Sequence, residues 1–475
     1  MTHRLILVTG ATGYIASLLI PRLLEQGYGV RVMARQPEQL KGRAWYSSVE
    51  VIQGDVTQPD RTAAALNGID TAYYLVHNMQ SGSGYTRIEL EGAHNFAEAA
   101  GGARAKHIIY LGGLADPNDK QLASHLRSRM ETGEKLRLGK VPVTEFRAGV
   151  IAGPGSISFE MIRFISEAFP VMIGPTWLKN KAQPIAAENV IDYLMAALET
   201  PEPRHRVFEI GGEGVFAYGD LMLKYASLRG LKRRLIMFPG IPQGFMAMGV
   251  AMMTPVPRRI AYALIGGLAN DSVVQNDEAR RIFPTIKLIN FEEATLNALR
   301  HLSPISVERV WEGSNRNVVR IKHEGFFIDY RRVEINASAE LAYRVLTSLG
   351  GRYGWLYANP LWQARGWLDR LIGGPGLRGR GNSMEMEPNS PVDYYRVEEM
   401  KPNSVLRLRS ELRTPGEGWM EWRIEEFGNR IYLHQTAFFA PRGLQGFLYW
   451  HILEPLHRLV FRGLIRAIKR RSESQ

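Results

Sequence analysis

Short apolar runs alternate with longer amphipathic segments through the first 150 residues of the chain. The runs that fit strands cover residues 5–9, 29–35, 49–56, 70–79, 106–114 and 142–153. The segments between them are long enough for crossover helices, and the first, "ASLLIPRLLEQ", ends before Gly27, a residue type common at helix C-termini. This alternation predicts an α/β fold, a doubly wound parallel sheet of the Rossmann type.

The pattern changes twice farther along the chain. From about residue 155 to residue 302 the alternation loosens, which indicates insertions that build a small substrate lobe on a first domain of residues 1–302. Residues 303–324 are polar and predict a linker. In residues 325–475, period-two alternation surrounds a serine-capped helix, and a helical stretch from Leu444 to Arg471 comes last. We expect this second domain to be α+β, an antiparallel sheet wrapped on a helix.

One uncharged segment, Leu235 to Pro257, is long enough to span a bilayer. Pro239, Pro242 and Pro255 interrupt it, with three glycines between them, and prolines disrupt a continuous helix. We therefore expect a buried or membrane-touching helical segment here rather than a spanning helix.

Composition narrows the chemistry. The chain of 475 residues has no cysteine, which excludes disulfides, thiolate nucleophiles and cysteine-based zinc sites. Its formal charge of +12 favours an anionic ligand, an anionic membrane surface or nucleic acid, unless it serves solubility alone. The basic residues are scattered and no nucleic-acid-binding motif is present, so we expect no nucleic-acid partner. The first apolar run is too short for a signal peptide, and we expect a cytoplasmic protein, with peripheral contact at the inner face of the membrane as an open alternative.

The sequence "LVTGATGYIA" stands between the first expected strand and the first expected helix, and its Gly10, Gly13 and Ala16 form G-x-x-G-x-x-A. Gly10 permits a tight turn, Gly13 lets the backbone approach a pyrophosphate, and a small residue at position 16 lets the helix pack on the strand. The helix N-terminus then presents amide hydrogens to the phosphates. We predict a dinucleotide site at the ends of the strands, with contacts from Gly10, Ala11, Thr12, Gly13, Tyr14, Ile15, Arg35, Asp55, Val56, Leu75, Val76 and His77.

Two residues bear on which dinucleotide binds. Folds that prefer NAD commonly place an acid near the end of the second strand, whereas an arginine accommodates the 2′-phosphate of NADP. Here "VRVMAR" ends in Arg35 and contains no acid. Asp55, after the third strand, either bonds the adenine amino group or caps the following helix, or does both. We predict NADP, with NAD as the less favoured cofactor.

Four segments, "TGATGYIA", "GDVTQPD", "YYLVHNM" and "FRAGVIAGPGS", resemble motifs of the atypical or extended short-chain dehydrogenase/reductases, close to the NmrA-like branch. Over nearly its full length the chain is similar to the YbjT-like NAD(P)-binding proteins. "QPIAAENVIDYL" and "RHRVFEIGGEGVFAYGDLM" match the substrate lobe of that group, and "GFLYWHILEPLHRLVFRGLIRAI" matches its final helix. The resemblance implies an oxidoreductase fold with an NAD(P) cofactor and a C-terminal helix-grip domain of the START/polyketide-cyclase type.

The catalytic groups of that superfamily are missing from the expected positions. Its active members resemble one another in a Tyr-x-x-x-Lys pair and an upstream serine, which together handle the carbonyl proton. None of the 19 tyrosines has a lysine four residues later. Leu126 and Met130 align with the tyrosine and the lysine, and Gly112 and Gly113 stand at the serine position.

Three other residues are candidates for a replacement catalytic role: His77 after the fourth strand, and His125 and Arg129 on the helix of Leu126. Each also has a structural interpretation, as a hydrogen-bonded histidine or as a residue on a helix surface. No cluster of His, Asp and Glu has metal-ligand spacing, so we expect no metal. Two hypotheses follow: an NADPH-dependent oxidoreductase acting on a lipophilic carbonyl, enone or quinone, and a non-catalytic NADP(H)-binding sensor or assembly protein.

The second domain leads to a third hypothesis, a lipid-binding adaptor at a membrane surface. Trp355, Tyr357, Trp362 and Trp367 either line an apolar pocket or fill the core. The final helix combines apolar, aromatic and basic residues, which suits an anionic bilayer, although packing of its apolar face on the sheet explains the same pattern. The residues concerned are Phe447, Leu448, Trp450, Leu453, Leu456, Val460, Phe461 and Leu464, with Arg458, Arg462, Arg466, Lys469, Arg470 and Arg471.

Overall fold

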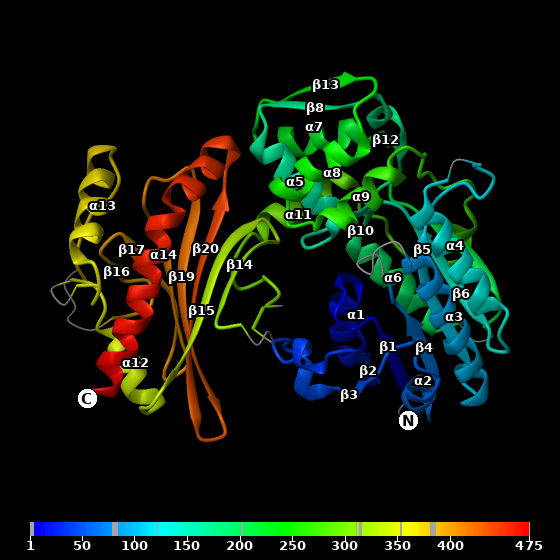
Figure 1. Ribbon diagram of the computed structural model, residues 1–475, viewed down its shortest axis with the longest axis horizontal. Helices are drawn as coiled ribbons and strands as arrows, with labels where there is room; N and C mark the ends of the chain where they lie inside the picture. The colour runs from blue at the N-terminus through cyan, green and yellow to red at the C-terminus, as the bar shows by residue number, and fades with distance from the viewer. Residues whose placement is uncertain are drawn as a thin grey trace. The chain divides into compact units, whose positions relative to one another are not determined.

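The chain forms two compact units (Figure 1). The computed structural model describes residues 4–77, 84–120, 122–200, 203–309, 311–312, 316–351, 354–380 and 386–474. Unit 1 comprises Met1–His301 with Glu308–Ser314, and unit 2 comprises Leu302–Val307 with Asn315–Gln475.

A seven-stranded parallel sheet forms the centre of unit 1. Its strands lie in the order β11-β6-β5-β4-β1-β2-β3. Their bounds are β1 Leu5–Thr9, β2 Gly29–Ala34, β3 Glu50–Gln53, β4 Thr71–Tyr74, β5 His107–Gly113, β6 Val143–Ala148 and β11 Arg206–Ile210. The direction of the strand order reverses between β1 and β4, and parallel sheets of this type bind ligands beside that reversal.

Helices cover both faces of this sheet (Figure 1). Because successive side chains of a strand point to opposite faces, Ile6 and Val8 of β1 enter one core and Leu7 enters another. The first core includes α1 (Tyr14–Glu25) and α6 (Ala187–Leu198). The second includes α2 (Pro59–Leu66), α3 (Tyr85–Gly102) and α4 (Ser124–Arg137). The expected doubly wound α/β fold is therefore confirmed.

The sheet differs from the expectation in two places. The segment at 142–153 is not one strand, because β6 ends at Ala148 and a separate short strand, β7 (Ile151–Ala152), follows. The seventh strand, β11, lies in "RHRVFEIGGEG", which we assigned to the substrate lobe. β11 is a five-residue edge strand that contacts the sheet only through β6, so its apolar run is too short to stand out in the sequence.

The lobe of unit 1 is built from the segments after β6. It packs around buried residues such as Phe159, Leu221 and Tyr225. Its helices are α5 (Ile157–Ala168), α7 (Tyr218–Leu228), α8 (Gln243–Met253), α9 (Arg258–Gly267) and α11 (Phe291–Arg300), whereas α10 (Glu278–Ile282) packs on the main sheet through Ala279. Its paired strands are β7 with β10 (Ile185–Ala186), β9 (Lys181–Ala182) with β12 (Phe216–Ala217), and β8 (Val171–Pro175) with β13 (Arg234–Phe238).

The uncharged segment from Leu235 to Pro257 is helical only in part. Its first residues belong to β13, and α8 follows after a turn. The expectation of a helical segment is therefore wrong for residues 235–238, where the alternation of half-buried and exposed residues reflects pairing with β8. No helix in the part of the chain that the structure describes is long and apolar enough to cross a membrane.

Unit 2 is an antiparallel sheet with helices against it, as expected for the second domain. The strand order is β14-β15-β20-β19-β18-β17-β16. The bounds are β14 Val318–His323, β15 Phe326–Ile335, β16 Pro391–Val392, β17 Tyr395–Lys401, β18 Val405–Ser410, β19 Gly416–Phe427 and β20 Arg430–Pro441, with helices α12 Ala339–Thr347, α13 Asn359–Leu371 and α14 Gly443–Glu473. β14 lies inside the expected linker of residues 303–324, because an edge strand rich in polar residues resembles a connector.

The long helix α14 serves mainly as a wall of the core of unit 2. Phe447, Trp450, Phe461 and Leu464 are buried, whereas Leu448 remains half exposed. Trp355 and Trp362 stack on each other within the same unit, with ring centroids 4.5 Å apart, and both are buried. The core interpretation therefore holds for these two tryptophans and for the buried side of α14.

Candidate functional site

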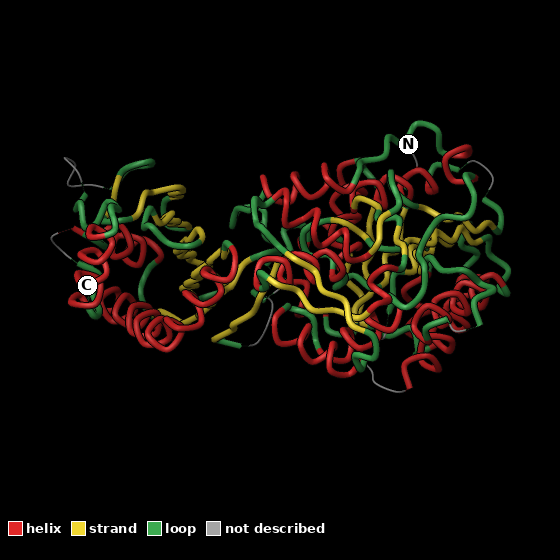
Figure 2. Tube along the Cα trace, turned by 90° about the horizontal axis from the view of Figure 1, so that it is seen from above, coloured by secondary structure: helices red, strands yellow, loops and turns green. Residues whose placement is uncertain are grey.

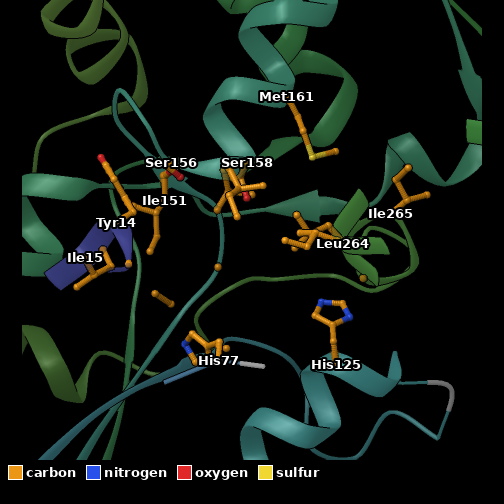
Figure 3. A pocket seen from close by; sticks show the side chains of 18 of the residues that line it. Tyr14, Ile15, His77, His125, Ile151, Ser156, Ser158, Met161, Leu264 and Ile265 are labelled. Atoms are coloured by element: carbon orange, nitrogen blue, oxygen red, sulfur yellow. The ribbon is translucent and has the colours of Figure 1, made fainter. Parts of the chain in front are cut away.

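Unit 1 contains a cavity of about 1230 Å³ at the ends of the parallel strands (Figure 3). All twelve residues proposed for cofactor contact line it, from Gly10 to His77, and so do the catalytic candidates His125 and Arg129. The fold therefore brings together residues from β1, β2, β3, β4 and α4 that are up to 119 positions apart in the sequence.

The glycine turn joins β1 to α1 at one end of the cavity. Gly10 has a φ of +67°, and a Cβ atom there would overlap the carbonyl oxygen of Leu75. The amide of Gly13 donates a hydrogen bond of 2.8 Å to the carbonyl oxygen of Gly10, and α1 begins at Tyr14 with no side-chain cap. The first amides of α1 are therefore available to an anion in the cavity.

The exit of β4 is tied to β1 next to this turn. The Thr9 hydroxyl donates to the carbonyl oxygen of Tyr73, at 3.0 Å, and accepts from the amide of Leu75, at 3.3 Å. Leu75, Val76 and His77 then run along the cavity. Burial lowers the pKa of His77 well below its usual value, and the nearby Arg129 guanidinium adds to this effect.

Arg35 and Asp55 follow β2 and β3 at the same edge of the sheet. The Arg35 side chain is 64% exposed, and its Nε lies 4.0 Å from Oδ2 of Asp55. Asp55 does not cap α2, contrary to one of the two roles we expected, because α2 begins at Pro59. Its Oδ1 instead accepts from the amide and the hydroxyl of Thr57, at 3.0 and 2.9 Å. This turn holds the carboxylate at the cavity wall.

α4 carries His125 and Arg129 on the side that faces β5. The side chains of Leu126 and Arg129 lie directly over Gly113, so the positions that align with the superfamily's tyrosine and serine are neighbours here too. The Arg129 carbonyl oxygen accepts a hydrogen bond of 2.9 Å from the hydroxyl of Tyr110. Its guanidinium forms no ion pair with any described residue, which leaves a cation at the cavity wall.

His125 is a neutral histidine at neutral pH. Its ring lies against Gly267 of α9 and is almost completely buried, and Figure 3 shows it directed toward Leu264 and Ile265. Burial lowers its pKa to about 3, and the positive charge of Arg129 acts in the same direction. His125 therefore offers the cavity a neutral imidazole rather than an acidic imidazolium.

Six polar residues of the cavity were missed in the sequence: Gln36, Gln39, Ser156, Ser158, Tyr218 and Ser272. Ser156 and Ser158 follow β7 directly in "GPGSIS", so their position after a strand was a usable signal. Ser272 donates a hydrogen bond of 3.0 Å to the carbonyl oxygen of Leu114, 158 positions away, and no local pattern indicates this contact. Burial raises the pKa of Tyr218, which keeps its hydroxyl protonated.

The end of the cavity away from the glycine turn is apolar. Side chains from α5, β8, α7, β13, α8 and α9 enclose it, and among them Met161, Leu264 and Ile265 face the two histidines in Figure 3. Its other apolar lining residues include Ile162, Ile165, Met172, Leu178, Met222, Leu235, Met246, Val250 and Ile260. One continuous cavity thus joins a polar turn with helix amides to an apolar chamber.

Comparison with known proteins agrees with this geometry. Residues 10–135 match a family model described as NAD(P)H-binding, and residues 323–464 match one described as a protein of unknown function (DUF2867). Unit 1 carries an NAD(P)H-binding Rossmann domain. The residues fit this cofactor, because the uncapped start of α1 leaves backbone amides for a phosphate, and the positive φ of Gly10 makes the tight turn that brings them to the cavity.

The NAD(P)H-binding domain has relatives among enzymes and among assembly factors. A 3 beta-hydroxysteroid dehydrogenase/Delta 5-->4-isomerase from Mycobacterium tuberculosis is 34% identical over 107 residues, which span 22% of this chain and only 28% of that protein. A photosystem II assembly factor, Ycf39 of Trieres chinensis, is 22% identical over 309 residues, 62% of this chain and 90% of that protein. The NADPH complex of quinone oxidoreductase QOR2 from Escherichia coli shares the fold, with a TM-score of 0.50, 16% identity, and coverage of 62% of this chain and 99% of that one.

We predict that Gly10→Ala weakens NADPH binding by at least about tenfold, because the added methyl group overlaps the Leu75 carbonyl and forces either the turn or β4 to move. Titration of NADPH fluorescence measures the dissociation constant. Gly102→Ala is the control, since a Cβ at that helix end meets nothing within 4 Å. Equal dissociation constants for the two variants would contradict the assigned turn.

A second prediction concerns pH. Because the pKa of His125 is about 3 in the folded chain and about 6.5 in the unfolded chain, the unfolded state binds more protons between these values, and stability falls as pH falls below 6.5. Between pH 7 and pH 5, the free energy of unfolding of unit 1 should fall by roughly 1–2 kcal/mol more in the wild type than in His125→Gln. Urea denaturation at both pH values tests this, and identical pH dependence would refute the buried, neutral His125.

Proposed function

We propose that the chain is an NADPH-dependent oxidoreductase that reduces a lipophilic carbonyl, enone or quinone. The observation that carries this proposal is the single cavity in which the nucleotide turn and an apolar chamber are continuous. A dinucleotide fills the polar end of such a cavity, and the apolar end has the lining that favours an apolar substrate. The steroid and quinone named for two of the relatives are also lipophilic, which supports the substrate class.

The binding roles follow from position. The amides at the start of α1 and the Gly10 turn hold the pyrophosphate, and Asp55 lies where the adenine end would approach β3. Arg35, at the end of β2, is the group that meets a 2′-phosphate. Arg129 lines the cavity, and its charge would stabilise a phosphate or an oxyanion there. When bound, NADPH supplies a hydride.

The side chains available for the proton favour particular substrates. The cavity has no Tyr-x-x-x-Lys pair, and Leu126 lies over Gly113 where the tyrosine would be. The neutral imidazole of His125 and the hydroxyl of Ser158 can donate hydrogen bonds to a substrate oxygen but are weak acids. Enones and quinones need the least acid, because hydride addition to them gives an enolate or a phenolate-like oxyanion, which water can protonate later. We therefore favour these two classes over simple ketones.

The alternative function is nucleotide sensing without turnover. The observation in its favour is the same replacement of tyrosine, lysine and serine by Leu126, Met130 and glycine. A relative named as an assembly factor aligns over 90% of its own length, which agrees with this alternative. In that case, bound nucleotide would set the conformation that a protein partner recognises.

NADPH oxidation in the presence of a panel of quinones, enones and aldehydes tests the two functions. With NADPH deuterated at nicotinamide C4, reduction of an enone or an aldehyde transfers deuterium to a carbon of the product. Reduction of a quinone is measured instead as one NADPH oxidised for each quinone reduced. Gly10→Ala is the matched control, and its turnover should fall when NADPH is kept near the wild-type dissociation constant. Tight NADPH binding without consumption across the whole panel would refute the oxidoreductase and leave the sensor.

The cofactor choice has its own test. We predict that Arg35→Ser weakens NADPH binding about tenfold and changes NADH binding less than about threefold, because only NADPH carries a 2′-phosphate for the guanidinium. Arg300→Ser, an exposed arginine on α11 that does not line the cavity, is the control. Unchanged NADPH affinity in Arg35→Ser would overturn the assignment of NADP through this residue.

A further inference from the structure

The lobe of unit 1 exposes apolar side chains from a two-stranded sheet. β8 and β13 pair in parallel, with Met172 and Leu235 on the inward side. The outward side presents Val171, Ile173, Ile236 and Phe238, which are 44–59% exposed. A sheet face that looks outward is normally polar, so this one is unusual for a surface in water. β8 and β13 lie at the edge of unit 1 that faces the viewer in Figure 2.

The neighbouring helix α8 is apolar all round. It contains no charged residue, and only Ala247 and Val250 are buried. Phe245, Met248 and Met252 are 63%, 45% and 66% exposed. A helix of this composition is normally enclosed by protein or lipid. We call these outward side chains of β8, β13 and α8 the lobe face.

The lobe face surrounds an opening at the apolar end of the cavity. Five apolar residues line this end and are exposed, so they mark where it reaches the surface: Ile157, Phe169, Val171, Ile173 and Phe245. The nucleotide end has its own exposed lining, at Thr12, Arg35, Gln36 and Gln39. A water-soluble substrate would gain nothing from the apolar entrance. A lipophilic molecule would pass from an apolar surface into the apolar chamber without crossing water.

The stretch of chain that contains β13 and α8 carries charges of one sign. Residues 221–270 contain seven basic residues and no aspartate or glutamate. Lys232 and Arg234 are exposed immediately before the uncharged segment, and Arg258 and Arg259 are exposed immediately after it. Apolar residues flanked by cations are what an anionic bilayer binds, since the cations meet the headgroups while the apolar groups enter the acyl boundary.

We propose that unit 1 docks on an anionic lipid bilayer through the lobe face, and that the substrate enters the cavity from that bilayer. The entry of substrate rests on the proposed oxidoreductase function, whereas docking does not. A second exposed apolar stripe lies on α14 in unit 2, at Leu448, Ile452, Leu456 and Leu459. Glu454 lies on the same helix as this stripe, and none of the four residues lines the cavity of unit 1. The stripe therefore serves as the comparison surface.

Co-sedimentation of the full chain with vesicles tests docking. Vesicles of phosphatidylcholine alone are compared with vesicles containing phosphatidylglycerol, at low and at high salt. We expect binding to the anionic vesicles that is at least about tenfold tighter than to the neutral ones and weakens with salt. Arg234→Ser with Arg258→Ser should remove most of this preference.

The apolar part of the lobe face is tested with Phe238→Ser combined with Met248→Ser, since neither residue lines the cavity. We expect at least about a tenfold loss of vesicle affinity, with an unchanged thermal midpoint because both side chains are exposed. Leu448→Ser with Ile452→Ser on α14 is the matched control and should retain binding. Loss of binding in the α14 variant alone, or no binding at any lipid charge, would overturn docking through the lobe face.

Two further readouts separate the remaining outcomes. Light scattering measures the mass of the free protein and tests whether the lobe face instead joins two copies of the chain. A dimer that the Phe238→Ser, Met248→Ser variant dissociates, together with no binding to vesicles, would overturn the proposal. Turnover of a long-chain quinone held in anionic vesicles should fall at least about tenfold in that variant, while turnover of a water-soluble short-chain quinone stays unchanged. Docking without NADPH consumption across the whole panel of quinones, enones and aldehydes would refute the oxidoreductase and leave docking established.

Discussion

The close approach of the Gly10 backbone to the carbonyl oxygen of Leu75 is the constraint on which the nucleotide site depends. Only a residue without a Cβ fits there, and only a residue that tolerates a φ of +67° makes the turn. The same contact, with the two hydrogen bonds of the Thr9 hydroxyl, fixes where β4 ends relative to β1. The start of α1 and the path of Leu75 to His77 are therefore set together, so the helix amides and the histidine face one space.

The chemistry of that space follows from what encloses it. Segments of the lobe that are distant in sequence close the far end with apolar side chains, and α9 covers the buried ring of His125. Burial and the positive charge of Arg129 keep both histidines neutral. The cavity therefore has a fixed positive charge and weak hydrogen-bond donors in place of a strong acid. This arrangement suits substrates whose reduction creates a stabilised anion.

The same lobe also determines what reaches the site. An apolar helix and an apolar sheet face surround the entrance, and a stretch of fifty residues without an acid supplies cations beside them. Cations and apolar side chains are thus both found around the opening at the apolar end of the cavity. In unit 2, by contrast, one side of α14 packs its apolar residues into the core against the antiparallel sheet.

The sequence by itself determined the α/β class of unit 1, the glycine turn, the position of Arg35 directly after a strand, and the absence of the tyrosine and lysine pair. Each of these depends on residues that are close together in one strand, turn or helix. It also indicated the antiparallel second unit through period-two alternation. It did not show that β11 joins the main sheet or that β14 lies in the expected linker, because short edge strands make few contacts and carry little periodicity. Only the tertiary structure placed Ser272 beside Leu114, buried His125 against Gly267 and opened the cavity at the lobe face. Those features arise from contacts between residues about 140 to 160 positions apart, and no local pattern in the chain records them.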